Sequence, residues 1–259
     1  MEDIGTVELA VEETAKGRVA RLALSNPKKL NALSPTLVAA LAARAGELAR
    51  DDGLRVVVLS GAGRRAFAAG ADLGVLTELD EASGRAFITA LHRAIDAVRR
   101  LPCPVIAMLR GYCFGGAMEL AAACDMRIAD TTLVAGMPEV RVGIPSVIEA
   151  CLLPRLVGWG KASELLMTGE NIDAAEALRV DFVQRLCPPE ELEEQTRRWI
   201  EAILAAGPGA VRAQKRIMRG WEELPEAEAI AASIGEFAAM FPTGEPAEFM
   251  RPFTERRKG

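Results

Sequence analysis

The chain has 259 residues, half of them hydrophobic, with a formal net charge of −5 and a pI near 5.2. This length predicts one large domain, or a main domain with a smaller extension. We expect no nucleic-acid partner because no dense basic cluster is present, and no membrane association because no run of roughly 18 apolar residues occurs. The acidic N-terminal letters MEDIGTVELAVEE are not typical of a secretory signal.

Strand and helix patterns alternate through the first half of the chain. They predict, in order, strands at 7–13 and 18–25, a helix from Ser34 as N-cap and Pro35 at its first position, a strand at 54–61, a helix at 80–101 that ends before Pro102, a strand at 104–111, a helix at 115–125, and short strands at 126–130 and 132–136. Strands that alternate with helices are typical of a layered α/β core.

From about residue 160 the patterns are mostly helical. Helices are predicted at 161–169, 173–180, 190–207, 208–224 and 227–241, with a short strand at 182–188. A helical end on an α/β core often packs against another chain or folds back as a lid.

The cysteines and the histidine narrow the possible chemistry. Five cysteines are scattered and never spaced as CxxC, which argues against a disulfide framework or a zinc site and favours a reducing cytoplasm. The single histidine, His92, excludes a His-rich metal site, and its helical spacing predicts an ordinary helix residue. We therefore expect a cytoplasmic protein with no metal.

Glycine-rich loops follow the predicted strands. GAGRRA (61–66) is a weak form of the dinucleotide fingerprint, but more glycines rather than a helix come next, so a plain strand-to-loop turn is the better interpretation. FAAGAD (67–72) and FGGAME (114–119) each follow a buried strand and offer backbone amides. Two such donors that converge from neighbouring strands would form an oxyanion hole.

Four segments occur together in a specific order. SNPKKLNALS (25–34), RRAFAAGADL (64–73), GYCFGGAMELAAACDMRIA (111–129) and MPEVRVGIP (137–145) closely resemble the enoyl-CoA hydratase/isomerase family, or crotonase superfamily. The resemblance implies an α/β fold built as a crotonase-type spiral of β-β-α repeats in residues 1–195. It implies that residues 196–259 form a C-terminal helical region that assembles a homotrimer or a hexamer.

The resemblance also implies an acyl-CoA thioester substrate and a set of catalytic groups. The amides of Ala71 and Gly116 would form the oxyanion hole. Glu119 would orient and activate water, and Glu139 would protonate the α-carbon. Paired carboxylates in a desolvated pocket push their pKa values apart, which suits them to different roles. Taken alone, Glu119 could be a first-turn helix acid and Glu139 a surface loop acid.

Coenzyme A contacts are implied along the N-terminal segment and near the C-terminus. Lys28 and Lys29 suit phosphates, although a charged turn explains either lysine equally well. Phe253 would lie near the adenine, and Arg256 or Arg257 near a phosphate. The remaining substrate contacts implied by the family are Ala32, Ala69, Gly70, Asp72 and Leu73. CoA is part of the substrate, so no separate cofactor is expected.

The sequence departs from the family in the acyl-pocket region. Ala117 replaces a glycine, and Ser146, Val147 and Glu149 stand where hydratases carry small residues. Glu149 is either a third acid near the site or a helix acid paired with an arginine such as Arg141 or Arg155. Asp181 also replaces a frequent glycine, without a functional interpretation.

The interpretation that fits these features is an enoyl-CoA hydratase, a hydro-lyase. A double-bond isomerase, or a hydrolase or decarboxylase of the same fold, remains an alternative because the oxyanion hole serves all of them. A noncatalytic acyl-CoA-binding relative is a further alternative, although mere binding needs neither glutamate.

Overall fold

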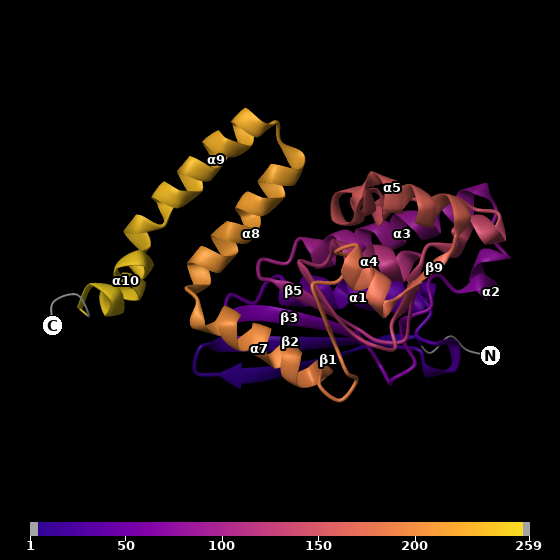
Figure 1. The fold of residues 1–259 in the computed structure, drawn as a ribbon, viewed down its shortest axis with the longest axis horizontal. Helices are drawn as coiled ribbons and strands as arrows, with labels where there is room; N and C mark the ends of the chain where they lie inside the picture. Colours follow the sequence, from indigo (N-terminus) through magenta and orange to yellow (C-terminus); the bar gives the residue numbers. More distant parts are fainter. Residues whose placement is uncertain (1–4, 256–259) are drawn as a thin grey trace.

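The computed structural model describes residues 5–255 as an α/β core with a helical extension (Figure 1). The strands are β1 (Thr6–Thr14), β2 (Gly17–Ser25), β3 (Leu54–Gly61), β4 (Ala66–Ala68), β5 (Val105–Leu109), β6 (Tyr112–Phe114), β7 (Met126–Asp130), β8 (Val134–Gly136), β9 (Asn171–Asp173) and β10 (Arg185–Cys187). The α-helices are α1 (Pro35–Leu48), α2 (Leu73–Leu76), α3 (Glu81–Arg99), α4 (Gly116–Ala123), α5 (Leu153–Thr168), α6 (Ala174–Arg179), α7 (Leu192–Ala205), α8 (Pro208–Glu223), α9 (Glu226–Ala239) and α10 (Glu245–Glu255). The short 3-10 helices are η1 (Pro27–Lys29), η2 (Pro138–Val142), η3 (Ile148–Leu152) and η4 (Phe241–Thr243).

The strands form two sheets. The larger has the order β1-β2-β3-β5-β7-β10, with β1 and β2 antiparallel and every other neighbouring pair parallel. The smaller has the order β4-β6-β8-β9. The pairs β3-β4, β5-β6 and β7-β8 each carry the chain from the larger sheet into the smaller one, and helical segments follow. This arrangement confirms the expected spiral of β-β-α units.

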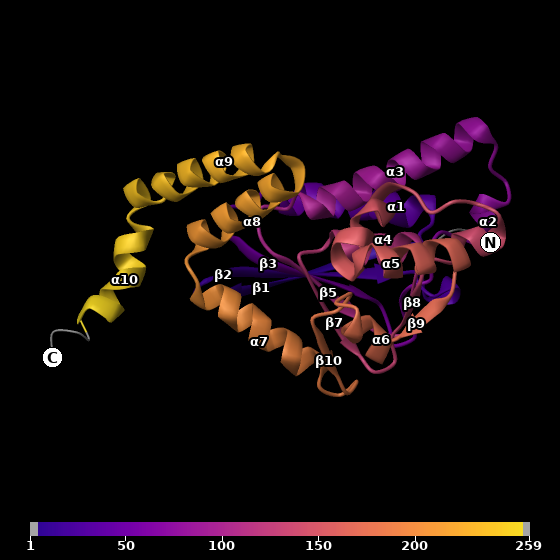
Figure 2. The same cartoon turned by 45° about the horizontal axis from the view of Figure 1, so that its top comes forward.

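Each face of the larger sheet packs on its own apolar core. Along β3, Val57 and Leu59 join the core beneath α1, α3 and α4, whereas Val56 and Val58 join a second core that includes Ile200 of α7. Figure 2 shows α1 and α3 on one side of the sheet and α7 on the other. A strand buried on both faces has no alternation of polar residues, which explains the continuous apolar run in its sequence.

Local signals set several of the helix boundaries. The Ser34 side chain accepts the Leu37 N–H at the start of α1, and Pro35 occupies the first position of the helix, as predicted. After the GAGRRA stretch the chain enters β4 and not a helix. A dinucleotide-binding loop needs a helix directly after it, so the plain strand-to-loop turn is confirmed. β4, β6 and β9 were not predicted, because three-residue strands carry almost no periodic pattern.

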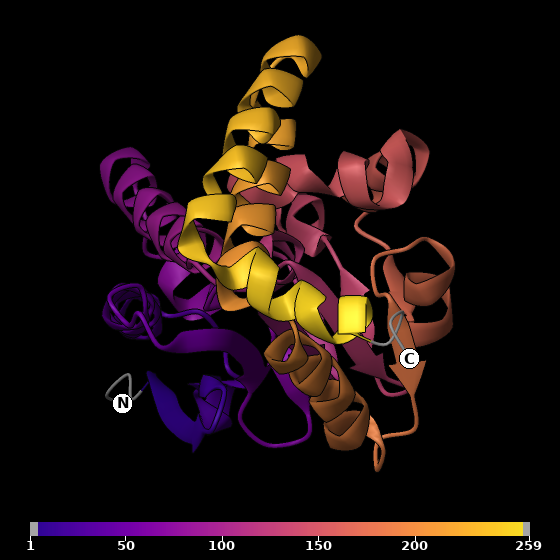
Figure 3. The same cartoon turned by 90° about the vertical axis from the view of Figure 1, so that its left-hand side faces the viewer.

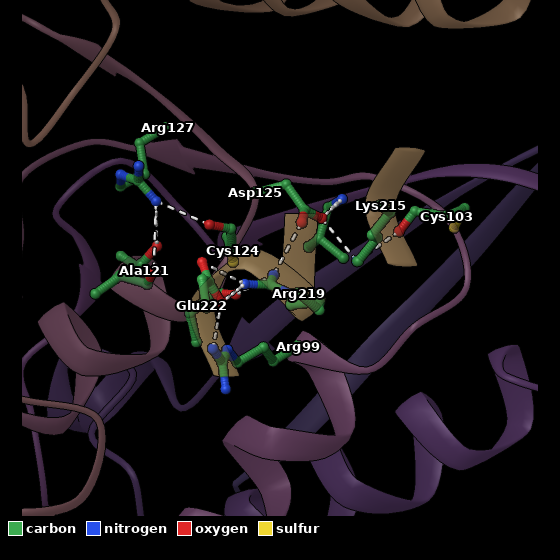
Figure 4. Close-up of polar contacts among 12 residues, drawn as sticks. Arg99, Cys103, Ala121, Cys124, Asp125, Arg127, Lys215, Arg219 and Glu222 are labelled. Atoms are coloured by element: carbon green, nitrogen blue, oxygen red, sulfur yellow. Dashed lines mark hydrogen bonds and ion pairs between the residues drawn. The ribbon is translucent and has the colours of Figure 1, made fainter. Parts of the chain in front are cut away.

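The C-terminal helices divide into two groups. α7 packs on the larger sheet, and the predicted boundary at residue 195 lies inside it. α8 is tied to the core by Lys215, whose Nζ donates to Asp125 at 2.7 Å and to the Cys103 carbonyl at 2.8 Å (Figure 4). α9 folds back along α8, and α10 continues away from the core (Figures 1 and 3). Within residues 5–255, no helix is long and apolar enough to span a bilayer.

Candidate active site

A cavity of about 640 Å³ opens where the smaller sheet meets α3 and α4. The residues that follow β4, β6 and β8 reach its lining, so three successive turns of the spiral supply the polar part. The opposite wall belongs to α2 and α3 and is apolar; it consists of Leu73, Leu76, Phe87, Ile88 and Leu91. An apolar cavity with a few convergent polar groups is typical of a small-molecule site.

Ala71 and Gly116, the predicted oxyanion-hole residues, both line this cavity. The Leu33 N–H donates to the Gly70 carbonyl at 2.8 Å, and the Leu33 carbonyl accepts from the Asp72 N–H at 3.4 Å. In such a parallel bridge the residue between the two bonds turns its own N–H away from the partner strand, so the Ala71 N–H points away from Leu33. Gly116 begins α4, where the first N–H groups have no partner within the helix.

Two glycines permit the loops to approach each other. Gly70 has φ 86°, and a Cβ there would lie 2.9 Å from the Phe114 carbonyl oxygen. Gly115 has φ 53°, and a Cβ there would lie 2.2 Å from Oε1 of Glu139. Both positions therefore require glycine for conformation and for space, which is why this stretch of the sequence is glycine-rich.

Glu119 lies on α4, lines the cavity and is only 3% exposed. Burial raises its pKa to about 9, and the nearby Glu139 and Glu149 carboxylates add to the shift. The backbone N–H groups of Val147 and Ala150 act in the opposite direction. Without substrate, Glu119 therefore holds a proton at neutral pH.

Glu139 lies in the first turn of η2 and also lines the cavity. Its Oε2 accepts a hydrogen bond from the Ser146 hydroxyl at 2.9 Å. Burial raises the pKa of Glu139, whereas the bond from Ser146 lowers it. Ser146 was predicted only as a pocket residue, and its partnership with Glu139 was missed because it depends on how η2 folds the chain back.

Glu149 does not line the cavity, but it lies close enough to Glu119 to raise the pKa of that carboxyl. The Glu149 side chain is 7% exposed, and its Oε1 lies 2.7 Å from Nδ1 of His92 on α3. Of the two interpretations of Glu149, the pairing with an arginine is wrong, since its partner is His92 and Arg141 donates to the Thr168 carbonyl. His92 is a helix residue as predicted, yet its ring has a specific partner.

Three of the residues predicted to bind coenzyme A line the cavity, namely Ala69, Gly70 and Leu73, whereas Ala32 is buried and is not in the lining. Lys29 forms an ion pair with the buried Asp72 carboxylate, which also caps α2 by accepting the Gly74 N–H. Lys28 is exposed.

The other predicted positions divide between the cavity and the rest of the molecule. Val147 lines the cavity, whereas Ala117 is fully buried and packs in the core. Phe253 is 72% exposed on α10. α10 and α2 lie at opposite ends of the molecule (Figures 1 and 2). Arg256 and Arg257 lie outside the described residues.

Asp181 has a structural explanation. Its backbone adopts φ 62°, in the left-handed region that glycine occupies at little cost and that Asp tolerates better than most residues. A glycine in relatives at this position suits the same turn between α6 and β10.

Comparison with known proteins agrees with this geometry. A model of the enoyl-CoA hydratase/isomerase family matches residues 14–259. The chain belongs to this family. It is 34% identical over 244 residues to a short-chain-enoyl-CoA hydratase of Clostridium acetobutylicum, with 94% of each chain covered. It is 32% identical to a crotonyl-CoA hydratase of Syntrophomonas wolfei, with 93% of each chain covered.

Solved structures show the same fold for family members. The crystal structure of an enoyl-CoA hydratase from Bacillus anthracis superimposes with a TM-score of 0.90 at 31% identity, over 96% of each chain. An enoyl-CoA hydratase from Mycobacterium smegmatis also gives a TM-score of 0.90, at 29% identity and over 96% of each chain. The helical extension therefore belongs to the family fold.

Proposed function

We propose that this family member is an enoyl-CoA hydratase that adds water across the 2,3-double bond of an enoyl-CoA thioester, or catalyses the reverse. The observation that carries the proposal is the meeting of Glu119 and Glu139 in one cavity with the N-terminal end of α4 and the Ala71 loop. Water addition needs two proton-transferring groups beside one small volume, and this cavity supplies them.

The thioester carbonyl oxygen would accept hydrogen bonds from the N–H groups of Ala71 and Gly116. Negative charge moves onto that oxygen as the hydroxyl adds at the β-carbon, so the donors stabilise the enolate more than the ground state. The loss of one such donor typically costs ~10²–10³ in kcat.

The two glutamates would move the protons. Ionised Glu119 takes a proton from water while the C–O bond forms at the β-carbon. Protonated Glu139 gives its proton to the α-carbon, and the π bond between the two carbons is lost. Since Glu119 is protonated in the free molecule near neutral pH, it must release that proton before it can act as the base.

The cavity favours a short or branched acyl chain. Val147 lines it where hydratases carry small residues, and the apolar wall from α2 and α3 suits hydrocarbon. The relatives named for short-chain enoyl-CoA and crotonyl-CoA support this size class. Lys28 would face the CoA phosphates with Lys29 near them, and the chemistry needs no metal or redox cofactor.

The C-terminal helices would assemble a homotrimer or a hexamer. α9 and α10 leave a row of large apolar side chains exposed on this single chain, namely Ile230, Ile234, Phe237, Phe249, Met250 and Phe253. An exposed apolar surface of this kind is typical of a protein interface. The five cysteines are all free, which supports a place in the reducing cytoplasm.

The test is the hydration of crotonyl-CoA and several branched enoyl-CoAs, followed as loss of the absorbance of the conjugated thioester. We expect Glu119→Gln and Glu139→Gln each to lower kcat by about 10²–10⁴. Glu170→Gln, at an exposed site outside the cavity, is the matched control and keeps full activity. Hydration of none of these substrates by the wild type would overturn the proposal.

A further inference from the structure

Three ionisable groups lead from the cavity to the surface of the molecule. Glu119 is 3% exposed and Glu149 is 5% exposed, whereas the His92 side chain is 50% exposed. Neither Glu149 nor His92 lines the substrate cavity. The line of groups thus begins at two buried acids and ends at an imidazole that is exposed to water outside the cavity.

The first step of this line joins Glu119 to Glu149. η3, which contains Glu149, packs against α4, which carries Glu119. The charge of Glu149 adds to the burial and the Glu139 charge that raise the pKa of Glu119, so the two carboxyl groups lie near each other. Oε2 of Glu149 has no hydrogen-bond partner among residues 5–255, so a proton would pass between the two carboxyl groups through one water molecule.

The second step joins Glu149 to His92. Oε1 of Glu149 lies 2.7 Å from Nδ1 of His92. Oε2 of Glu149 is buried and has no hydrogen-bond partner among residues 5–255. A buried acceptor without a partner is costly, so its retention calls for an explanation. A carboxylate with one oxygen open and the other on an imidazole is arranged to take a proton on one side and release one on the other.

We propose that Glu149 and His92 form a proton path that connects Glu119 with solvent behind the substrate cavity. The O–H bond of Glu119 breaks as the linking water takes its proton, and that water gives another of its protons to Oε2 of Glu149. The Glu149 carboxyl then turns so that the new O–H faces His92. This O–H bond breaks as an N–H bond forms at Nδ1, and the N–H bond at Nε2 breaks as its proton passes to water. The proton that leaves equals the proton that Glu119 gained, so no other reactant is needed.

This path rests on the proposed function, in which Glu119 gains a proton in every turnover. While the product fills the cavity, water reaches Glu119 poorly from the front. A route at the back lets Glu119 lose its proton, whereas Glu139, which is less buried than Glu119, regains one from water after the product leaves. The path would therefore act on the recovery of the enzyme and not on the first encounter with substrate.

Charged groups around the path are few. Burial raises the pKa of Glu149, and the hydrogen bond with His92 lowers it. Asp96, on α3 one turn from His92, adds a smaller upward shift. Arg100 pairs with Asp96 at 2.6 Å and so offsets part of that negative charge. Glu119 faces Glu149 from α4, and Glu139 of η2 faces Glu119.

The path is tested without catalysis through the imidazole signal of His92. His92 is the only histidine in the chain, so the NMR spectrum of its ring needs no assignment by mutation. We expect Glu119→Gln to change the pH dependence of this signal, because the ionisation of Glu119 is felt along the path. Arg85→Gln, on the same helix with a side chain 78% exposed, should leave it unchanged. An unchanged signal in Glu119→Gln at every pH would overturn the path.

The kinetic test uses His92→Gln, which retains an N–H donor for Glu149 but cannot relay a proton. We expect kcat to fall on the order of tenfold, less than for a group that acts on substrate itself. kcat/KM should stay within about twofold, because the affected step follows product formation. Added imidazole should restore kcat in His92→Gln and do little to the wild type or to Arg85→Gln.

The outcomes separate the path from the proposed function. If the wild type hydrates no enoyl-CoA, the proposed function fails, and the NMR measurement still decides whether Glu119 and His92 are coupled. If the wild type is active, two results overturn the path: an unchanged kcat in His92→Gln, or a parallel fall in kcat and kcat/KM that imidazole does not reverse. The parallel fall would indicate a structural role. Glu149→Gln should reproduce the loss of kcat, without rescue by imidazole because the break then lies deeper in the protein.

Discussion

The molecule buries carboxylates in two different ways. Behind α8, the Asp125 carboxylate accepts hydrogen bonds from Lys215 at 2.7 Å and from Arg219 at 2.9 Å (Figure 4). In the cavity, Glu119 and Glu139 lie near each other with no cation among their described contacts, and only His92 stands behind them, through Glu149. The first group balances its charges, whereas the second concentrates charge of one sign.

The difference teaches what each group can do. The paired charges around Asp125 connect α8 to the core, and Glu222 extends the same network by pairing with Arg219 and Arg99. Burial raises the pKa of Glu119 and of Glu139, and no cation in the described part of the chain pairs with either carboxyl to offset the shift. A raised pKa brings proton transfer by a carboxyl group closer to neutral pH. A buried carboxylate thus stabilises the fold in one place and supports chemistry at the expense of stability in the other.

The largest expected effect concerns Glu119 and Glu139, the two acids proposed to transfer protons, when both are changed. If Glu119 and Glu139 act as one unit, the double variant Glu119→Gln/Glu139→Gln should lose about as much kcat as the worse single variant, ~10²–10⁴. The measurement is the kcat for crotonyl-CoA of both single variants and the double variant. Losses that multiply would show that the two acids act independently.

The next prediction removes one cation from the ion pairs around Asp125. Lys215→Met should leave Asp125 with Arg219 as its remaining cation and remove the donor to the Cys103 carbonyl, and it should lower the free energy of unfolding by about 1.5–3 kcal/mol. Urea denaturation measures it, and Asp125→Asn should cost less in the Lys215→Met background than in the wild type because one of its charged partners is already absent. A loss below about 1 kcal/mol, the value for exposed pairs, would contradict a buried structural role.

Removal of the Glu119 carboxyl should increase the free energy of unfolding, whereas loss of Lys215 decreases it. The pKa of Glu119 is about 9 in the folded chain against the ordinary glutamate value of 4.5, so the native state binds more protons between these values. The wild-type free energy of unfolding therefore falls as pH rises through that window. Glu119→Gln lacks this loss and should be more stable by about 1–3 kcal/mol at pH 8, with little difference near pH 4. A less stable variant at pH 8 would contradict the account.

The smallest effect comes from the outer edge of the network. The Glu222 side chain is 33% exposed, so its pairs with Arg99 and Arg219 are partly screened by water. Glu222→Gln should cost less than about 1 kcal/mol in urea denaturation. A cost equal to that of Lys215→Met would remove the distinction between the centre of this network and its edge.

The sequence predicted the elements that have strong periodic or capping signals. The continuous apolar run of β3 and the Ser34-Pro35 start of α1 are local features, and both were found as predicted. The family resemblance placed Glu119, Glu139, Ala71 and Gly116, and the structure brings all four to one cavity. These positions were predictable because they stand in the FAAGAD, FGGAME and MPE motifs that carry the resemblance.

Contacts between distant segments could not be predicted. His92 and Glu149 are 57 positions apart, and their contact depends on how η3 packs against α3. The arginine expected beside Glu149 was chosen for nearness in sequence, which is a weak guide to tertiary contacts. Ile148 adopts φ 42°, and no propensity rule predicts that a β-branched residue accepts this conformation.

One measurement tests the central claim most directly, namely mass spectrometry of the product formed from crotonyl-CoA by the wild type. The account predicts a 3-hydroxyacyl-CoA that has gained the mass of one water, with this product lost in Glu139→Gln. A double-bond isomer of unchanged mass, or release of free CoA, would contradict hydration as the function of the Glu119 and Glu139 site.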